Sequence, residues 1–191
     1  MWNEQIIMML LEGIKDTLYM TLTSTLIGYV IGLPMGILLT VTDKDGIHPN
    51  TAVYKVLDVI ANLIRSVPFL ILLIVLIPFT RFLIGRSYGP TATIVPLVIA
   101  AAPYIARMVE SSLKEVDAGV IEAARSMGAS NFTIVTKVML VEARTSLIVG
   151  ATISLGTILG YSAMAGTVGG GGLGDIAVRY CLLYTSPSPR D

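Results

Sequence analysis

The sequence predicts an all-α, polytopic helical membrane protein, and three observations support this fold class. Hydrophobic residues make up 54% of the 191-residue chain, and charged residues only 14%, against roughly 25% in soluble proteins. The mean hydropathy is +0.78. Four apolar windows approach the roughly 20 residues that a helix needs to cross a bilayer. Too little polar chain remains to cover four such helices in a soluble fold.

The first element that we expect is an interfacial amphipathic segment over residues 1–17. Five apolar residues share one helical face there: Ile6, Ile7, Leu10, Leu11 and Ile14. Such a face is typical of a helix that lies in the membrane interface. Glu4 precedes these residues and no basic start is present, so the segment does not resemble a cleaved signal peptide. The transmembrane domain is then expected over residues 18–180.

Four membrane helices follow from the four apolar windows. The windows cover residues 18–41, 59–79, 92–109 and 147–168. Glycines recur at four-residue spacing in the first and fourth windows, an arrangement that lets helix backbones approach closely. These glycines are Gly28, Gly32, Gly36, Gly156 and Gly160. We therefore expect both helices to pack tightly.

The second window contains a charge, Arg65, followed by Ser66. A charge at that depth costs about 2.5–3.5 kcal/mol on insertion scales, so it should face other helices or water. Arg65 and Ser66 are therefore candidates for lining a translocation path. The alternative is that Arg65 snorkels or pairs with Asp58, seven residues earlier on the same face.

The basic residues predict the orientation of the chain. If the stretch 107–144 is cytoplasmic, seven basic residues lie inside and four outside. The inside set is Lys44, Lys55, Arg107, Lys114, Arg125, Lys137 and Arg144, and the outside set is Lys15, Arg81, Arg86 and Arg179. The excess of positive charge inside places the N-terminus outside.

Other classes of site find little support. The single histidine, His48, and the single cysteine, Cys181, offer no metal site or disulfide. The balance of 13 basic and 13 acidic residues argues for no nucleic-acid partner. The GxGxxG pattern of Gly169, Gly171 and Gly174 follows a membrane window instead of a strand, so we expect a flexible external turn and no nucleotide cofactor.

A polar stretch, EAARSMGAS, lies in the expected cytoplasmic loop 110–145. Asp117 is placed to cap a helix from Ala118, and Gly128 to end it. Ser130 is placed to cap a second helix that runs toward Glu142. Four side chains share a face of the first helix: Val120, Ile121, Ala124 and Met127. Because the alanines at 123 and 124 are small, another surface can approach closely, and we expect a docking element.

This stretch resembles the coupling motif of ABC importer permeases. EAARSMG is followed by nine residues and then VMLV, with Val141 where the family usually has proline. The resemblance makes five residues candidates for contact with an ATPase: Glu122, Ala123, Ala124, Gly128 and Ala129. Residues 65–81, 96–110 and 160–175 are similar to the permease subunit of bacterial methionine importers, and the likeness covers most of residues 15–180.

The resemblance implies a homodimer of permeases in the bacterial inner membrane, with two cytoplasmic ATPase subunits and an extracytoplasmic substrate-binding lipoprotein. Alternating access, driven by ATP, would carry methionine inward. The chain contains no GxxxxGK[ST] phosphate loop, so ATP-driven work needs a partner. The family further suggests that Tyr161, Ser162 and Met164 line the path near a gate, although Met164 is equally explained as a packing residue.

Two alternatives and one departure from the family complete the expectations. One alternative is an importer of the same family whose substrate is another small amino acid or an osmolyte. An intramembrane enzyme would need clustered acid, base or nucleophile groups at membrane depth, where only Arg65, Asp58 and Glu110 are near. The family pattern continues with a fifth membrane helix, whereas residues 181–191 read CLLYTSPSPRD. We expect these residues to be a tail foreign to the fold.

Overall fold

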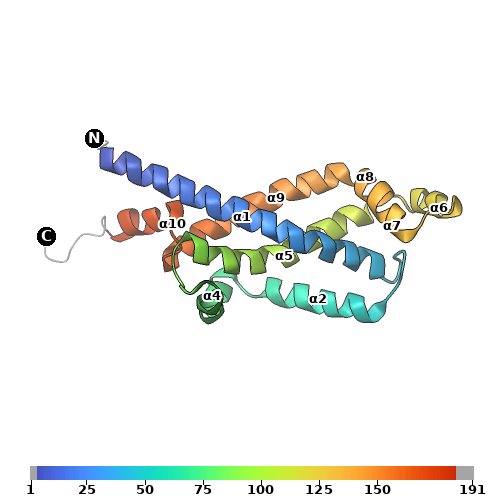
Figure 1. The fold of residues 1–191 in the computed structure, drawn as a ribbon, viewed down its shortest axis with the longest axis horizontal. Coiled ribbons are helices and arrows are strands. Elements are labelled where there is room, and N and C mark those ends of the chain that lie inside the picture. The colour runs from blue at the N-terminus through green and yellow to red at the C-terminus, as the bar shows by residue number, and fades with distance from the viewer. Residues whose placement is uncertain (1–3, 184–191) are drawn as a thin grey trace. The chain divides into compact units, whose positions relative to one another are not determined.

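The computed structural model describes residues 4–183, which are mainly helical and include no strand. The all-α prediction is confirmed. The helices in chain order (Figure 1) are α1 (Glu4–Thr42), α2 (Thr51–Ser66), α3 (Phe69–Val75), α4 (Ile77–Ile84), α5 (Pro90–Lys114), α6 (Ala118–Ser126), α7 (Asn131–Thr133), η1 (Ile134–Met139), α8 (Leu140–Glu142), α9 (Arg144–Ala165), η2 (Gly166–Val168), α10 (Gly172–Ile176) and η3 (Ala177–Leu183).

Three of these helices are long and apolar enough to cross a membrane, and the count rises to four if α2 and α3 form one broken span. The first, third and fourth predicted windows correspond to α1, α5 and α9. The second window is not one helix, which corrects the prediction. Pro68 precedes α3 in an extended conformation, with φ −55° and ψ 135°. Proline disfavours helical geometry in the residue before it, so α2 ends just ahead of Val67–Pro68.

The predicted domain boundaries have no direct counterpart in the helices. Helix α1 runs without a break from Glu4 to Thr42, so no helix ends at residue 17. The apolar face that includes Ile6, Ile7 and Leu11 is exposed. Its position at the membrane interface stays a prediction. The expected tail, residues 181–191, lies outside the described residues from position 184 onward.

The chain forms two compact units, and the first comprises Met1–Leu26, Val67–Ile99 and Leu155–Asp191. Within it, Thr17 connects the start of α1 to α10. Its hydroxyl oxygen accepts a hydrogen bond from the backbone N–H of Leu173 at 2.9 Å and donates one to the carbonyl of Gly13 at 2.8 Å. The aromatic rings of Phe69 and Tyr161 stack with centroids 4.6 Å apart, which joins α3 to α9.

One glycine prediction for this unit stays a prediction, and one is wrong. A Cβ atom at Gly156 or Gly160 would meet nothing within 4 Å, so no helix among the described residues lies close to these positions, and tight packing there stays a prediction. The turn that contains the GxGxxG pattern is packed, not loose. A Cβ atom at Gly170 would lie 2.7 Å from the carbonyl oxygen of Ala165 and 2.9 Å from Oγ1 of Thr93. This turn therefore needs glycine for lack of space.

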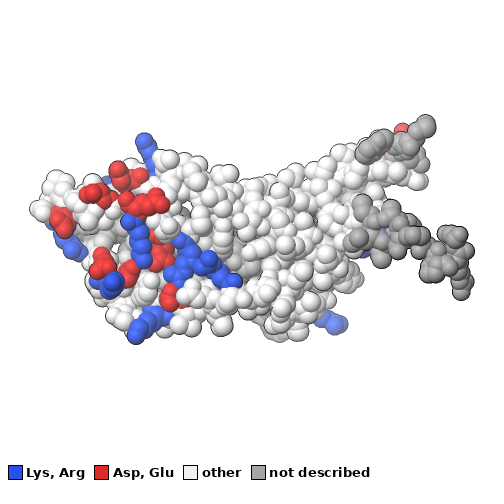
Figure 2. Space-filling model, turned by 180° about the vertical axis from the view of Figure 1, so that it is seen from behind, with Lys and Arg blue, Asp and Glu red and all other residues white. Residues whose placement is uncertain are grey.

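The second unit comprises Ile27–Ser66 and Ala100–Ser154. Its centre is the contact between α1 and α5, where the glycine prediction is confirmed. A Cβ atom at Gly32 would lie 2.7 Å from the carbonyl oxygen of Ala102 and 2.9 Å from Ile105. The absence of side chains lets the two helix backbones touch. On the face drawn in Figure 2, acidic and basic side chains are interspersed over this unit.

Candidate functional site

The candidate site is the hairpin of α6 and the helical segment that follows it, in the second unit. The side chain of Asp117 accepts a hydrogen bond from the backbone N–H of Gly119 at 2.7 Å, so Asp117 caps α6 as predicted. Ser130 caps the next segment, because its hydroxyl accepts from the N–H of Thr133 at 3.3 Å. That segment continues through η1 to the end of α8 at Glu142. Both predicted starts are confirmed.

Gly128 ends α6 in a Schellman motif. Its φ is +80°, a conformation that other residues adopt at a cost. The N–H of Ala129 donates to the carbonyl of Ala124 at 3.1 Å, and the N–H of Gly128 donates to the carbonyl of Arg125 at 3.0 Å. These two bonds satisfy carbonyls that the helix end leaves open. The spacing between the alanines and the glycine of EAARSMG is therefore the spacing of a short helix with its C-terminal cap.

The predicted apolar face of α6 is split between interior and surface. Ala124 is buried and α6 packs against η1. Met127, by contrast, is 81% exposed, and Phe132 on α7 is 78% exposed. Glu122 and Ala123 are also exposed. Exposed large apolar side chains on a polar hairpin mark a candidate protein–protein contact.

A groove lies beside α6 within the same unit. Its volume is about 610 Å³, and it is lined by α6, the end of α5 and the turn after α1. Glu122 lines it and makes no ion pair with any described residue. Arg125 crosses to the turn, where its Nη2 atom donates to the carbonyl oxygen of Ile47 at 2.8 Å. Helix α6 is therefore tied by a side chain to the turn between α1 and α2.

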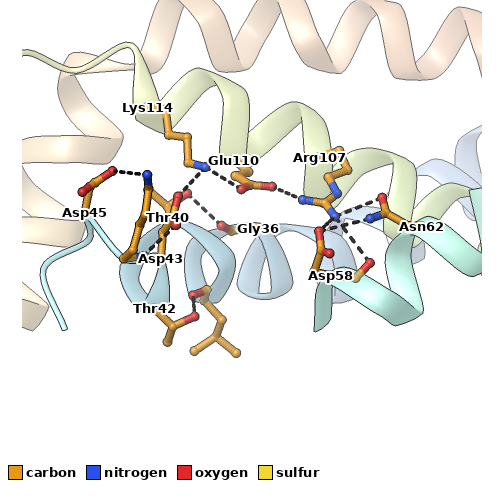
Figure 3. Close-up of polar contacts among 12 residues, drawn as sticks. Gly36, Thr40, Thr42, Asp43, Asp45, Asp58, Asn62, Arg107, Glu110 and Lys114 are labelled. Atoms are coloured by element: carbon orange, nitrogen blue, oxygen red, sulfur yellow. Dashed lines mark hydrogen bonds and ion pairs between the residues drawn. The ribbon is translucent and has the colours of Figure 1, made fainter. Parts of the chain in front are cut away.

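A chain of ion pairs, which was not predicted from the sequence, joins α2, α5 and the turn after α1 (Figure 3). Glu110 on α5 is its centre, with a side chain only 6% exposed. Its Oε2 atom accepts from Nη1 of Arg107 at 2.7 Å, and its Oε1 atom from Nζ of Lys114 at 2.8 Å. Arg107 also pairs with Asp58 on α2. Lys114 pairs with Asp43, which follows α1, at 2.6 Å.

The same contacts correct the suggested pairing of Arg65. Asp58 binds Arg107, and its Oδ1 atom also accepts from Nδ2 of Asn62 at 3.1 Å. Arg65 is exposed and forms no ion pair with any described residue. The signal available in the sequence was the spacing of Arg107, Glu110 and Lys114, which places all three on one face of a helix.

Asp43 lies outside the membrane-spanning segments and has a perturbed acidity. The hydrogen bond from Lys114 lowers the pKa of its carboxyl group, and this effect outweighs the opposing effect of burial. The backbone N–H of Lys44 also donates to it, at 2.7 Å. The carboxylate is therefore held in its charged form, in which it can keep Lys114 in place.

The predicted path residues fall in both units. Ser66 is exposed, and its hydroxyl donates to the carbonyls of Asn62 and Leu63 within α2. In the first unit, Ser162 is 1% exposed and its Oγ accepts from the hydroxyl of Thr21 at 3.4 Å. Tyr161 is half-buried under Phe69, and Met164 is exposed. Their role in a path stays a prediction.

The chain is similar to named transport proteins. It is 47% identical over 172 residues to a probable D-methionine transport system permease protein of Vibrio cholerae, covering 90% of this chain and 76% of the relative. It is 51% identical over 164 residues to the D-methionine transport system permease protein of Escherichia coli, covering 86% and 76%.

The chain is also similar in fold to solved structures of ABC transporters. One structure of the MetNI methionine ABC transporter in an inward facing conformation matches with a TM-score of 0.93 and 49% identity, over 97% of this chain and 86% of that chain. An amino acid ABC transporter at 23% identity matches with a TM-score of 0.75 over 94% of this chain and 81% of that chain, which shows the fold alone.

The family model of the binding-protein-dependent transport system inner membrane component matches residues 9–180. This match covers the exposed α6 hairpin, the α1–α5 contact and the ion pairs described above. The protein is thus a multi-pass inner-membrane transport subunit and not an enzyme. The chain belongs to the family of binding-protein-dependent transport system inner membrane components.

Proposed function

We propose that this chain is the permease subunit of an ATP-driven importer of methionine. The observation that carries the coupling mechanism is that EAARSMG forms the end of a capped nine-residue helix, α6, with Glu122, Ala123 and the C-cap residue Met127 exposed. The choice of methionine rests on the similarity to permeases of D-methionine transport systems in other bacteria.

The assembly that we propose contains two copies of this chain, two cytoplasmic ATPase subunits and an extracytoplasmic substrate-binding lipoprotein. Coupling to the ATPase subunits depends on Glu122, Ala123, Ala124, Gly128 and Ala129. Of these, Ala124 acts from beneath the surface, since its side chain is buried and its smallness sets how closely α6 lies on η1. Closure of the ATPase pair moves the two α6 helices together and opens the path outward.

The proposed path includes Arg65, Ser66, Tyr161, Ser162 and Met164. Support for Arg65 comes from its exposure and its lack of an ionic partner among the described residues, since an unpaired charge in a membrane segment needs water or a binding partner. Support for Met164 is its exposed, flexible thioether, which suits a movable apolar constriction. The stack of Tyr161 on Phe69 holds this part of α9 beside α3.

Uptake of labelled methionine tests this function. The chain is produced with its co-encoded ATPase and binding protein in cells that lack other methionine importers. We expect uptake that needs all three components and that unlabelled D- or L-methionine suppresses. Uptake of a different small amino acid or an osmolyte, with methionine not competing, would assign the permease to that substrate instead.

We further propose that the N-terminus lies outside, from the seven-to-four distribution of basic residues. In a chain with Cys181 replaced by serine, single cysteines are placed by Ser87→Cys and Ser126→Cys. An impermeant thiol reagent applied to intact cells should label position 87 only. Labelling at position 126 would reverse the orientation.

A further inference from the structure

The ion pairs centred on Glu110 lie outside the coupling motif, yet they connect to it. We propose that Arg107 and Lys114 are positioning residues for coupling: they hold α2, α5 and the end of α1 together, so that a movement of α6 displaces these three segments as one body. This inference rests on the proposed function, because it concerns how motion passes from α6 to the membrane helices.

The first step is the double attachment made by Arg107. Its guanidinium donates through Nη1 to Glu110 on its own helix and through Nη2 to Asp58 and Asn62 on α2. The Nη2 atom also lies 3.4 Å from the carbonyl oxygen of Asp58. A planar fork fixes the directions of all these bonds at once. Helix α2 therefore cannot slide along α5 without breaking several of them.

The second step is the attachment made by Lys114, one turn beyond Glu110. Its Nζ atom binds Asp43 at 2.6 Å, directly after the end of α1. The same ammonium lies 5.9 Å from the centre of the ring of Tyr54 on α2, within cation–π range. Lys114 thus touches the end of α1 and the first half of α2 together. Between Arg107 and Lys114, Glu110 is buried and bound at both oxygens.

The third step connects this body to α6. Asp43 and Ile47 belong to the same turn, which hydrogen bonds close tightly: the N–H of His48 donates to the carbonyl of Val41 at 3.0 Å. Arg125 on α6 donates to the carbonyl of Ile47. A displacement of α6 therefore pulls on the turn, and Asp43 passes the pull to Lys114 and α5. Each link in this route is a charged or backbone hydrogen bond between described residues.

An ion-pair chain of this kind has a simpler explanation, namely that it only stabilises the fold. The two roles predict different results. A residue that only stabilises changes the amount of assembled complex, and uptake and ATP hydrolysis fall together. A positioning residue changes the number of ATP molecules consumed for each substrate molecule imported, because hydrolysis continues while motion no longer reaches all helices.

The experiment uses the complete complex of permease, ATPase and binding protein in proteoliposomes. Arg107→Lys keeps the charge but removes the fork, and Asp58→Asn removes the acid on α2. The matched control is Arg144→Lys, the same substitution at an exposed arginine that has no ion pair among the described residues. We expect both test variants to raise the ATP consumed per methionine by about fivefold or more, the lower end of usual coupling between sites. The control should leave this ratio unchanged.

Exchange of the charges tests the pairing itself. Asp58→Arg and Arg107→Asp should each block uptake, and the double variant should recover much of it, because an arginine from α2 would again lie beside the acids on α5. Recovery of uptake in the double variant would support the pairing even if each single variant assembles poorly. An unchanged ratio in both Arg107→Lys and Asp58→Asn, or a double variant no better than the singles, would overturn the proposal.

The complex without substitutions is measured in the same series, and its methionine uptake tests the proposed function separately. If it imports another amino acid, the ratio is taken with that amino acid, and the test of Arg107 and Asp58 is unaffected.

Discussion

Substitution of Gly128 by valine should uncouple ATP hydrolysis from transport. The φ of Gly128 is +80°, and a Cβ atom there would meet nothing within 4 Å, so the backbone conformation alone decides the cost. A left-handed conformation costs an ordinary residue about 1–2 kcal/mol, with β-branched residues least tolerant. Valine would either keep this backbone conformation at that cost or lose the two hydrogen bonds of the Schellman motif. A free-energy change of this size alters the ratio of capped to uncapped α6 by about five- to thirtyfold.

The assay is methionine uptake and ATP hydrolysis by the complex in proteoliposomes. Gly128→Val should reduce uptake by about this factor, with insertion in the membrane unchanged. Gly128→Asn is the matched control, because asparagine tolerates the left-handed region, and Gly128→Ala should fall between them. Equal uptake by the valine and asparagine variants would refute the reasoning, since it would show that the conformation at position 128 does not position α6.

Three further outcomes follow. Glu122→Lys should weaken co-purification of the ATPase and abolish uptake without affecting insertion, whereas normal yield and normal uptake would remove Glu122 from the contact. Gly32→Val should destabilise the protein by about 1–3 kcal/mol through overpacking against Ala102 and Ile105, while Gly156→Ala, in open space, should change stability by less than about 0.5 kcal/mol; thermal unfolding in detergent compares them, and equal shifts would contradict the helix contact. The hydrogen bond from Lys114 lowers the pKa of Asp43, so the stability that this pair contributes is present above the ordinary carboxyl pKa of 3.8 and is lost as the pH falls below it through the lowered folded value. Asp43→Asn should therefore make the free energy of unfolding less dependent on pH in this acid range. An unaltered pH dependence would argue against the pair.

Local features of the fold could be predicted from the sequence because they depend on neighbouring residues. The caps at Asp117 and Ser130 and the ending at Gly128 need only one turn of chain each, and the structure has all three. The close packing of α1 at Gly28 and Gly32 was also predicted from their spacing, although the sequence did not identify α5 as the partner.

Features that depend on packing between distant segments could not be predicted. One local feature was also missed, because hydropathy averaged over the window 59–79 does not register the single residue Pro68, where α2 and α3 are separated. The pairing of Asp58 with Arg107 spans 49 residues and exists because α2 lies beside α5, whereas the suggested partner, Arg65, is on the same helix. At Gly156 and Gly160, the four-residue spacing indicates a smooth helix face but does not say what covers it.

The central claim is that α6 is the contact through which an ATPase drives this permease, and cross-linking tests it most directly. In a chain with Cys181 replaced by serine, Met127→Cys places a thiol on the exposed surface of α6. Combined with single cysteines across the surface of the co-encoded ATPase, it should give a specific disulfide within the assembled complex, and this disulfide should stop methionine uptake until it is reduced. Absence of any cross-link from position 127 in a complex that imports methionine normally would contradict the claim.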